Sequence, residues 1–122
     1  MTFYPLASDN WDDREKQALL RVIESNRFTM GPEVKTFEQD LATFHEVKHA
    51  IMTNSGSSAN LLMIASLCER GDIKRGDEVI VPAVSWSTTY FPLAQYGIKM
   101  VFVDVDEFGN IDSDATVRAL TD

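Results

Sequence analysis

The sequence predicts an α/β fold, because short β-branched apolar segments alternate with longer segments of helical periodicity in the second part of the chain. Three segments have the length and composition of buried strands: 49–53, 77–82 and 100–105. Helical spacing of apolar residues separates them, at 57–68 and at 88–96. This alternation is typical of a mostly parallel sheet that helices cover on both faces.

Residues 1–47 predict helices and no strand. Between 12 and 25, apolar side chains recur on one face and charged side chains on the other, which is typical of an amphipathic helix. Pro32 precedes a second apolar stripe that ends at Phe44, and proline is tolerated in a first helical turn. We therefore expect one partial domain over residues 1–122, with N-terminal helices in 1–47 and an α/β region in 48–122.

Glycine and proline delimit the later helices. Gly97 is expected to close the helix at 88–96, whereas Pro92 either kinks this helix or marks its true start. A last short helix is expected over 112–120.

The run from Asn54 to Leu62 predicts a tight turn at Gly56 that opens a helix near Ser57. The first N–H groups of such a helix have no intrahelical partner and lie at the positive end of its dipole, so this end can hold phosphate. A purely structural interpretation is also open, in which Ser57 or Ser58 is an N-cap and Gly56 a turn residue. The run matches neither the Walker loop nor the dinucleotide fingerprint.

A second strand-to-helix turn, residues 84–90, follows the strand expected at 77–82. In open α/β sheets, ligands bind outside the carboxyl ends of the strands, and this turn is expected at that edge. Trp86 lies in the turn. A tryptophan there either packs in the core or stacks on a flat heterocycle, and the spacing alone leaves both possibilities open.

Composition limits the classes of partner and compartment. A formal charge of −8 argues against nucleic acid and against an acidic membrane surface. The single Cys68 precludes an internal disulfide and is expected to be a small buried apolar residue. No signal peptide and no apolar segment of membrane-spanning length is apparent, so a cytoplasmic location is expected.

Several segments of the chain form a recognisable set: Pro5-Leu6-Ala7-Ser8, Trp11-Asp12-Asp13, Phe28-Thr29-Met30-Gly31, Phe37-Glu38, residues 76–82 and residues 102–106. Through these segments the chain resembles the DegT/StrS family of pyridoxal-phosphate enzymes, which modify nucleotide-linked keto sugars. Within the family, segments 28–31 and 85–90 resemble the dehydratases more than many aminotransferases. The resemblance implies the N-terminal part of the large domain of a fold-type I pyridoxal-phosphate-dependent transferase.

The resemblance also implies a cofactor, pyridoxal 5′-phosphate or pyridoxamine 5′-phosphate, and site residues for it. Carried over residue by residue, Gly56 and Ser57 would bind the cofactor phosphate and Ser58 would assist. Trp86 would stack on the pyridine ring. The implied partners are a nucleotide-sugar substrate and a second copy of the chain, since the family's enzymes are dimers; no metal is implied.

No catalytic residue is expected within this chain. In the family, the Schiff-base lysine, which dehydratases replace with a histidine, and the aspartate that pairs with the pyridinium nitrogen correspond to positions beyond Asp122. His45 and His49 match no catalytic position and are expected at a helix end and a strand start. The lysines are interpreted as surface charge: Lys48, Lys74 and Lys99.

Two classes of function remain open from the sequence. The first is a segment of a pyridoxal-phosphate enzyme that removes the C-3 hydroxyl of a nucleotide-linked 4-keto sugar or transfers an amino group to it. Such a segment, as a fragment or truncated chain, is expected to be catalytically incomplete and to self-associate. The second is a non-catalytic remnant that retains a phosphate-binding turn.

Overall fold

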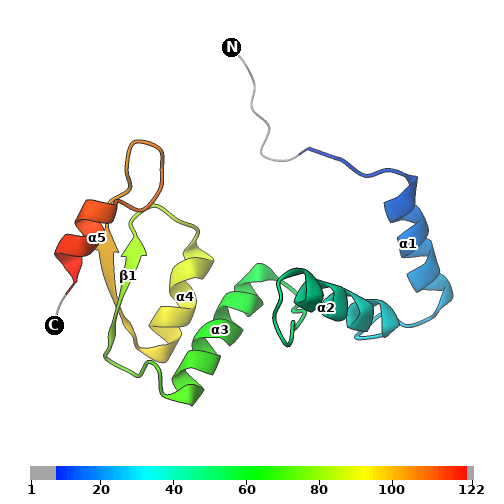
Figure 1. Ribbon diagram of the computed structural model, residues 1–122, viewed down its shortest axis with the longest axis horizontal. Coiled ribbons are helices and arrows are strands. Elements are labelled where there is room, and N and C mark those ends of the chain that lie inside the picture. Colours follow the sequence, from blue (N-terminus) through cyan, green and yellow to red (C-terminus); the bar gives the residue numbers. More distant parts are fainter. Residues whose placement is uncertain (1–7, 121–122) are drawn as a thin grey trace, which may run out of the picture. The chain divides into compact units, whose positions relative to one another are not determined.

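The computed structural model describes residues 8–120, which divide between two units, Met1–Met52 and Thr53–Asp122 (Figure 1). The Pro5-Leu6-Ala7 part of the family resemblance lies outside the described residues. The division expected from the sequence, between residues 47 and 48, lies slightly earlier in the chain than this boundary. Each unit is described by itself.

The first unit contains two helices, α1 (Asp13–Glu24) and α2 (Pro32–Phe44). Asp12 caps α1: its carboxylate accepts a hydrogen bond from the Arg14 backbone N–H at 2.7 Å, and its own N–H donates to Glu15 at 2.8 Å. Two hydrogen bonds from Arg14 lower the pKa of the Asp12 carboxyl. The bond from the Arg14 side chain has the larger effect, and the bond from its backbone N–H the smaller. Pro32 occupies the start of α2, as its fixed φ favours. Both predicted helices are confirmed.

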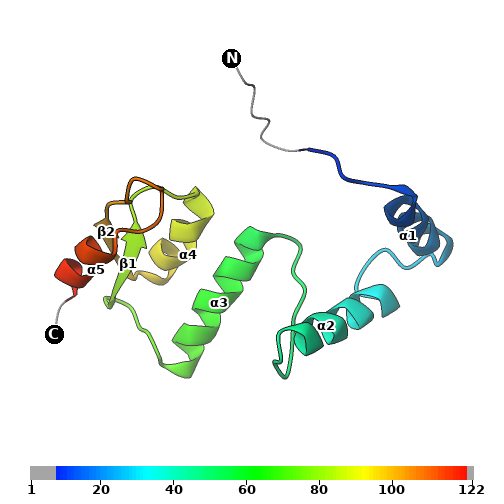
Figure 2. The same cartoon turned by 45° about the horizontal axis from the view of Figure 1, so that its top comes forward.

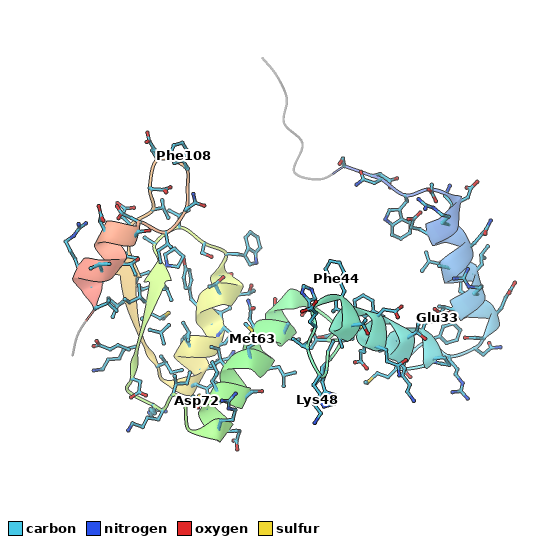
Figure 3. All side chains as sticks on the ribbon, viewed as in Figure 1. Glu33, Phe44, Lys48, Met63, Asp72 and Phe108 are labelled. Carbon is cyan, nitrogen blue, oxygen red and sulfur yellow. The ribbon has the colours of Figure 1, made fainter. Side chains whose placement is uncertain are left out.

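The apolar faces of these two helices are largely uncovered in the described part of the chain. No residue of α1 is buried, and Ala42 is the one buried residue of α2. Phe44, at the end of α2, is 80% exposed and meets the ring edge of His45, the exposed C-cap residue (Figure 3). The amphipathic pattern therefore predicts these helices correctly, but their apolar faces are not buried in a core within the described residues.

The second unit is an α/β unit in the order α3 (Gly56–Arg70), β1 (Glu78–Pro82), α4 (Ser87–Tyr96), β2 (Lys99–Val103) and α5 (Ser113–Ala119). The two strands pair in parallel, with a register that runs from Glu78 opposite Lys99 to Pro82 opposite Val103. The predicted α/β class with a parallel sheet is confirmed. Figures 1 and 2 show α4 and α5 on opposite sides of this strand pair.

The strand predicted from His49 to Thr53 is not formed. The segment has no regular secondary structure, and Ile51 and Met52 are 70% and 43% exposed. The Met52 N–H donates to the Glu38 carboxylate at 2.8 Å instead of to a neighbouring strand. Residues with high strand propensity favour a strand because they pack well in a half-buried sheet. This segment has no neighbouring strand to bond with, so that environment is missing. The expected three-stranded sheet is therefore two-stranded in residues 8–120.

The core of the second unit lies between α4 and the sheet. Val81, Leu93 and Ile98 form its buried cluster. Half-buried side chains surround it: Ile64, Cys68, Ile73, Val79, Tyr90 and Met100. Cys68 is thus partly buried and packs as a small apolar residue.

The ends of α4 follow from its glycine and its neighbours. Gly97 closes the helix with φ of 69°, a left-handed conformation that glycine adopts without strain, as predicted. Pro92 lies inside α4 and does not mark its start, because the helix begins at Ser87. At the other end, the Tyr90 hydroxyl donates to the Pro82 carbonyl at 2.7 Å, and its ring meets Phe102 at a centroid distance of 5.4 Å. These contacts tie α4 to the carboxyl end of β1.

Removing this hydroxyl should weaken the second unit. We expect Tyr90→Phe to lower the free energy of unfolding by about 1 kcal/mol, because the partly buried Pro82 carbonyl loses its donor. Urea denaturation of the intact protein measures the change. Tyr96→Phe, on the same helix, is the matched control, since no hydrogen bond of the Tyr96 hydroxyl occurs within residues 8–120. Equal losses for the two variants would contradict the assignment.

Candidate functional site

The start of α3 is capped by Ser55. The Ser55 hydroxyl accepts a hydrogen bond from the Ser58 N–H at 3.1 Å, and its carbonyl accepts from the Ala59 N–H at 3.0 Å. Thr53 Oγ1 also donates to this carbonyl, at 2.9 Å. The structural interpretation of Ser57 or Ser58 as the N-cap is therefore wrong. Gly56 is the first helical residue, as the predicted helix opening requires.

This cap leaves two backbone donors free at the helix start. The N–H groups of Gly56 and Ser57 have no intrahelical acceptor by position, and no acceptor within residues 8–120 pairs with them. Ser57 is exposed and adds a hydroxyl beside them. Ser58 offers one donor fewer, because its N–H already donates to Ser55; its hydroxyl accepts from Ser55 Oγ at 3.2 Å and keeps its own proton. The predicted phosphate-binding role fits Gly56 and Ser57 better than Ser58.

The space beside Gly56 is open. A Cβ atom added at Gly56 would meet nothing within 4 Å, so packing within the chain does not require glycine there. The absent side chain instead allows another molecule to approach the backbone closely. The donor set and this open space together fit a phosphate group.

The start of α4 carries Trp86 as its N-cap residue. The indole makes no side-chain capping bond and is 77% exposed, while the Trp86 carbonyl accepts from the Thr89 N–H at 3.0 Å. Core packing, one of the two interpretations of this residue, is therefore excluded for the described structure. A large exposed aromatic ring at a helix start can stack on a planar ligand.

The structure brings the starts of α3 and α4 side by side. Both helices begin at the end of the unit where β1 finishes (Figures 1 and 2). A cavity of about 160 Å³ lies between them. It is lined by Ser57, Ser58, Leu61, Thr88, Phe91, Pro92 and Gln95. Trp86 does not line this cavity, but only one residue separates it from Thr88 at the same helix start.

The first turns of α3 and α4 contain no acidic residue. The first turns of the other helices each contain at least one: Asp13 and Glu15 in α1, Glu33 in α2 and Asp114 in α5. Carboxylates near a helix start neutralise the positive end of its dipole, so their absence preserves it. In a chain with a formal charge of −8, this local arrangement favours an anion at these two helix starts over the rest of the surface.

Other candidate features carry no site in residues 8–120. No group of three or more His, Cys, Asp or Glu side chains in this part of the chain could hold a metal ion. His49 is exposed and does not begin a strand. The three lysines that were interpreted as surface charge are exposed: Lys48, Lys74 and Lys99. No helix there is long and apolar enough to cross a membrane.

Sequence reasoning missed two contributors to this geometry. Ser55 was not assigned a role, although a serine three residues before Ser58 has the spacing of an N-cap bond to the third helical N–H. Thr88, which lines the cavity, belongs to no sequence motif. It reaches the cavity wall because α4 packs against α3.

Comparison with known proteins gives one family over nearly all of the chain. The family model of the DegT/DnrJ/EryC1/StrS aminotransferases matches residues 9–122. The GDP-4-keto-6-deoxy-D-mannose 3-dehydratase of Yersinia pseudotuberculosis is 54% identical and covers 100% of the chain. A Streptomyces venezuelae enzyme, dTDP-3-amino-3,4,6-trideoxy-alpha-D-glucose transaminase, is 36% identical over 74% of the chain and 23% of its own length.

A solved structure matches to the same extent. The E. coli GDP-4-keto-6-deoxy-D-mannose-3-dehydratase with bound hydrated PLP is 52% identical and has a TM-score of 0.90 over 100% of this chain. The chain spans 32% of that structure and 32% of the Yersinia relative, about a third of their length. The predicted resemblance and the predicted type of fold are both confirmed by these matches.

The cap assignment at α3 gives a test that needs no ligand. We expect Ser55→Ala to lower the free energy of unfolding by about 1 kcal/mol, because the Ser58 N–H loses its acceptor. Ser57→Ala, two residues later, should change it by less than about 0.5 kcal/mol, as for a surface side chain away from special features. Urea denaturation of both variants decides the matter. A larger loss for Ser57→Ala would return the cap to Ser57.

Proposed function

The chain belongs to the DegT/DnrJ/EryC1/StrS aminotransferase family, and from this membership we propose that it forms the phosphate-binding part of a pyridoxal-phosphate site. The whole protein would act on a nucleotide-linked 4-keto sugar. Its chain spans about a third of the relatives' length, so activity, substrate and partners are proposed for the protein to which this segment contributes.

One observation carries the proposal: two unpaired backbone N–H groups at the start of α3, at Gly56 and Ser57, beside open space within the described chain. A phosphate monoester has oxygen acceptors that match these donors and the Ser57 hydroxyl. Ser58 would assist by fixing the helix start through its bond to Ser55. The absence of acidic residues from the first turns of α3 and α4 supports the same assignment.

Trp86 supplies the second contact that the proposal requires. Its indole is exposed and stands at the start of α4, next to the helix turn that borders the cavity with Ser57. We assign it to stacking on the pyridine ring of pyridoxal 5′-phosphate or pyridoxamine 5′-phosphate. A planar aromatic face restricts a flat heterocycle to one plane, so Trp86 would orient the ring that the α3 donors anchor.

When bound, the cofactor would supply an electron sink for the cleavage of a bond in the sugar. The residues of this chain would do the binding and the orienting. The residue that forms a covalent bond or moves protons, a lysine in aminotransferases or a histidine in dehydratases, is assigned to sequence beyond Asp122. Within residues 8–120, no histidine or lysine lines the α3–α4 cavity.

The 3-dehydratase activity is favoured over amino transfer. The relatives at 54% and 52% identity are GDP-4-keto-6-deoxy-D-mannose 3-dehydratases, whereas the Streptomyces transaminase is 36% identical. We therefore propose removal of a C-3 hydroxyl from a nucleotide-linked 4-keto-6-deoxy sugar, in deoxysugar or lipopolysaccharide biosynthesis. We also propose a homodimer, which the exposed apolar faces of α1 and α2 support.

A non-catalytic remnant is the second candidate. It shares the phosphate-binding turn, and the uncovered helix faces of the first unit would suit assembly with a separate chain. The two candidates differ in turnover, because both keep the turn that would hold the cofactor phosphate and only the enzyme would convert a nucleotide-linked 4-keto sugar. Turnover of such a sugar by the intact protein therefore separates them.

The cofactor phosphate can be tested at two adjacent residues. We expect Ser57→Ala in the intact protein to weaken pyridoxal 5′-phosphate binding by about 1–3 kcal/mol, the scale of a hydrogen bond to a charged group. Gly56→Ala should weaken binding as well, because its methyl group fills space that is empty in the free chain. Spectrophotometric titration measures both affinities. If both variants bind as the unaltered protein does, the phosphate is not at α3.

The indole should matter for affinity and not for folding. We expect Trp86→Ala to raise the dissociation constant of pyridoxal 5′-phosphate about tenfold, consistent with the loss of an aromatic stacking contact. Because the ring is 77% exposed, the free energy of unfolding should change by less than about 0.5 kcal/mol. Trp86→Phe, which keeps an aromatic face, should recover part of the affinity. A variant that loses stability but not affinity would exclude stacking.

A further inference from the structure

Pro92 leaves one backbone carbonyl of α4 without its helical donor. In a regular helix the N–H of residue 92 would donate to the carbonyl of Thr88, four residues earlier, and proline has no N–H. The proline ring also pushes that carbonyl away from the helix axis. Pro92 is buried, and Thr88 is half-buried, so the freed acceptor lies where an unsatisfied carbonyl is costly.

Asn60 of α3 satisfies this acceptor. Its side-chain Nδ2 donates to the Thr88 carbonyl oxygen at 3.3 Å, in a partly buried contact between residues 28 positions apart. Because the partner is a carbonyl, which only accepts, the amide must present its nitrogen to Thr88. Apart from this bond, α3 packs against α4 through Ile64 and Cys68, which lie against the apolar cluster that contains Leu93. Apolar packing favours contact without fixing how far one helix slides along the other.

We infer that Asn60 is a positioning residue, which sets the start of α4 against the start of α3 by its hydrogen bond to the carbonyl that Pro92 frees. The inference rests on the proposed function, in which α3 anchors the cofactor phosphate and Trp86 stacks on the ring. Asn60 itself touches neither group. It lies one turn after Gly56, and Thr88 lies just after Trp86, so their bond links the two helix starts directly.

The link gives one consequence that a merely structural residue would lack. A cofactor held at both ends needs a fixed separation between its phosphate donors and its stacking ring. Without the Asn60 bond, the apolar packing of α3 on α4 remains, but the helix starts can shift relative to each other. Cofactor affinity should therefore fall more than the stability of the fold.

The experiment is a double-mutant cycle in the intact protein, with Asn60→Ala, Pro92→Ala and both together. Asn60→Ala should raise the dissociation constant of pyridoxal 5′-phosphate about tenfold. The Pro92→Ala substitution restores the missing N–H, which can satisfy Thr88 within α4. In the Pro92→Ala background, the effect of Asn60→Ala should therefore shrink to less than about twofold. Ser66→Ala is the matched control on α3 and should have no effect, because within residues 8–120 the Ser66 hydroxyl bonds only the Leu62 carbonyl of its own helix.

An equal effect of Asn60→Ala in both backgrounds, or none in the unaltered protein, would overturn the inference. Asn60→Asp keeps the size of the side chain but points an acceptor at an acceptor, so it should lose at least as much affinity as Asn60→Ala. It decides the question if Pro92→Ala does not fold, since near-normal binding by Asn60→Asp would exclude the hydrogen bond.

The same cycle also separates this inference from the proposed function. Measured as urea unfolding midpoints without cofactor, the effect of Asn60→Ala should again be smaller in the Pro92→Ala background. If the unaltered protein does not bind pyridoxal 5′-phosphate, the proposed function fails and with it the positioning role. The coupling in the unfolding midpoints would then show that the bond itself still forms.

Discussion

The parallel pairing of β1 with β2 is the constraint on which the arrangement of the candidate site depends. It brings the carboxyl ends of both strands to one edge, where Pro82 lies opposite Val103. The chain leaves β1 at that edge, and the Tyr90 hydroxyl holds the following helix to the Pro82 carbonyl. The backbone between β1 and α4 therefore places Trp86 at this edge, independently of the contacts of its side chain.

Helix α3 reaches the same place by a different route. No strand precedes it in the described chain, so its start is located by side-chain packing on α4 and by the Asn60 bond. The two halves of the site thus differ in physical origin. One is held by a hydrogen-bond ladder, and the other by an apolar interface with one directional contact.

Local chemistry allowed most elements to be predicted from the sequence. Asp12, Pro32 and Gly97 act through their own backbone or side-chain geometry, so their helix ends could be predicted without knowledge of the fold. The segment 49–53 was predicted wrongly because a strand needs a neighbour, and β propensity contains no information on whether one is present. The place of Thr88 in the cavity wall could not be predicted, because it depends on the packing of α4 against α3. The exposure of Trp86 likewise depends on what the rest of the chain leaves uncovered.

The irregular segment around Ile51 and Met52 has a consequence for the order in which the molecule is assembled. The contacts between β1 and β2 join residues about 21 positions apart, as for Glu78 and Lys99, so this short crossover can close early, with little loss of chain entropy. The segment 49–53 has strand composition but no ladder, and Ile51 is 70% exposed. Within residues 8–120, the segment's one backbone hydrogen bond is that of the Met52 N–H to the Glu38 carboxylate, so its strand-forming residues stay unpaired. Unpaired segments of this kind are where non-native association begins. Two charged residues close to this segment, Lys48 and Glu38 of α2, would oppose such association.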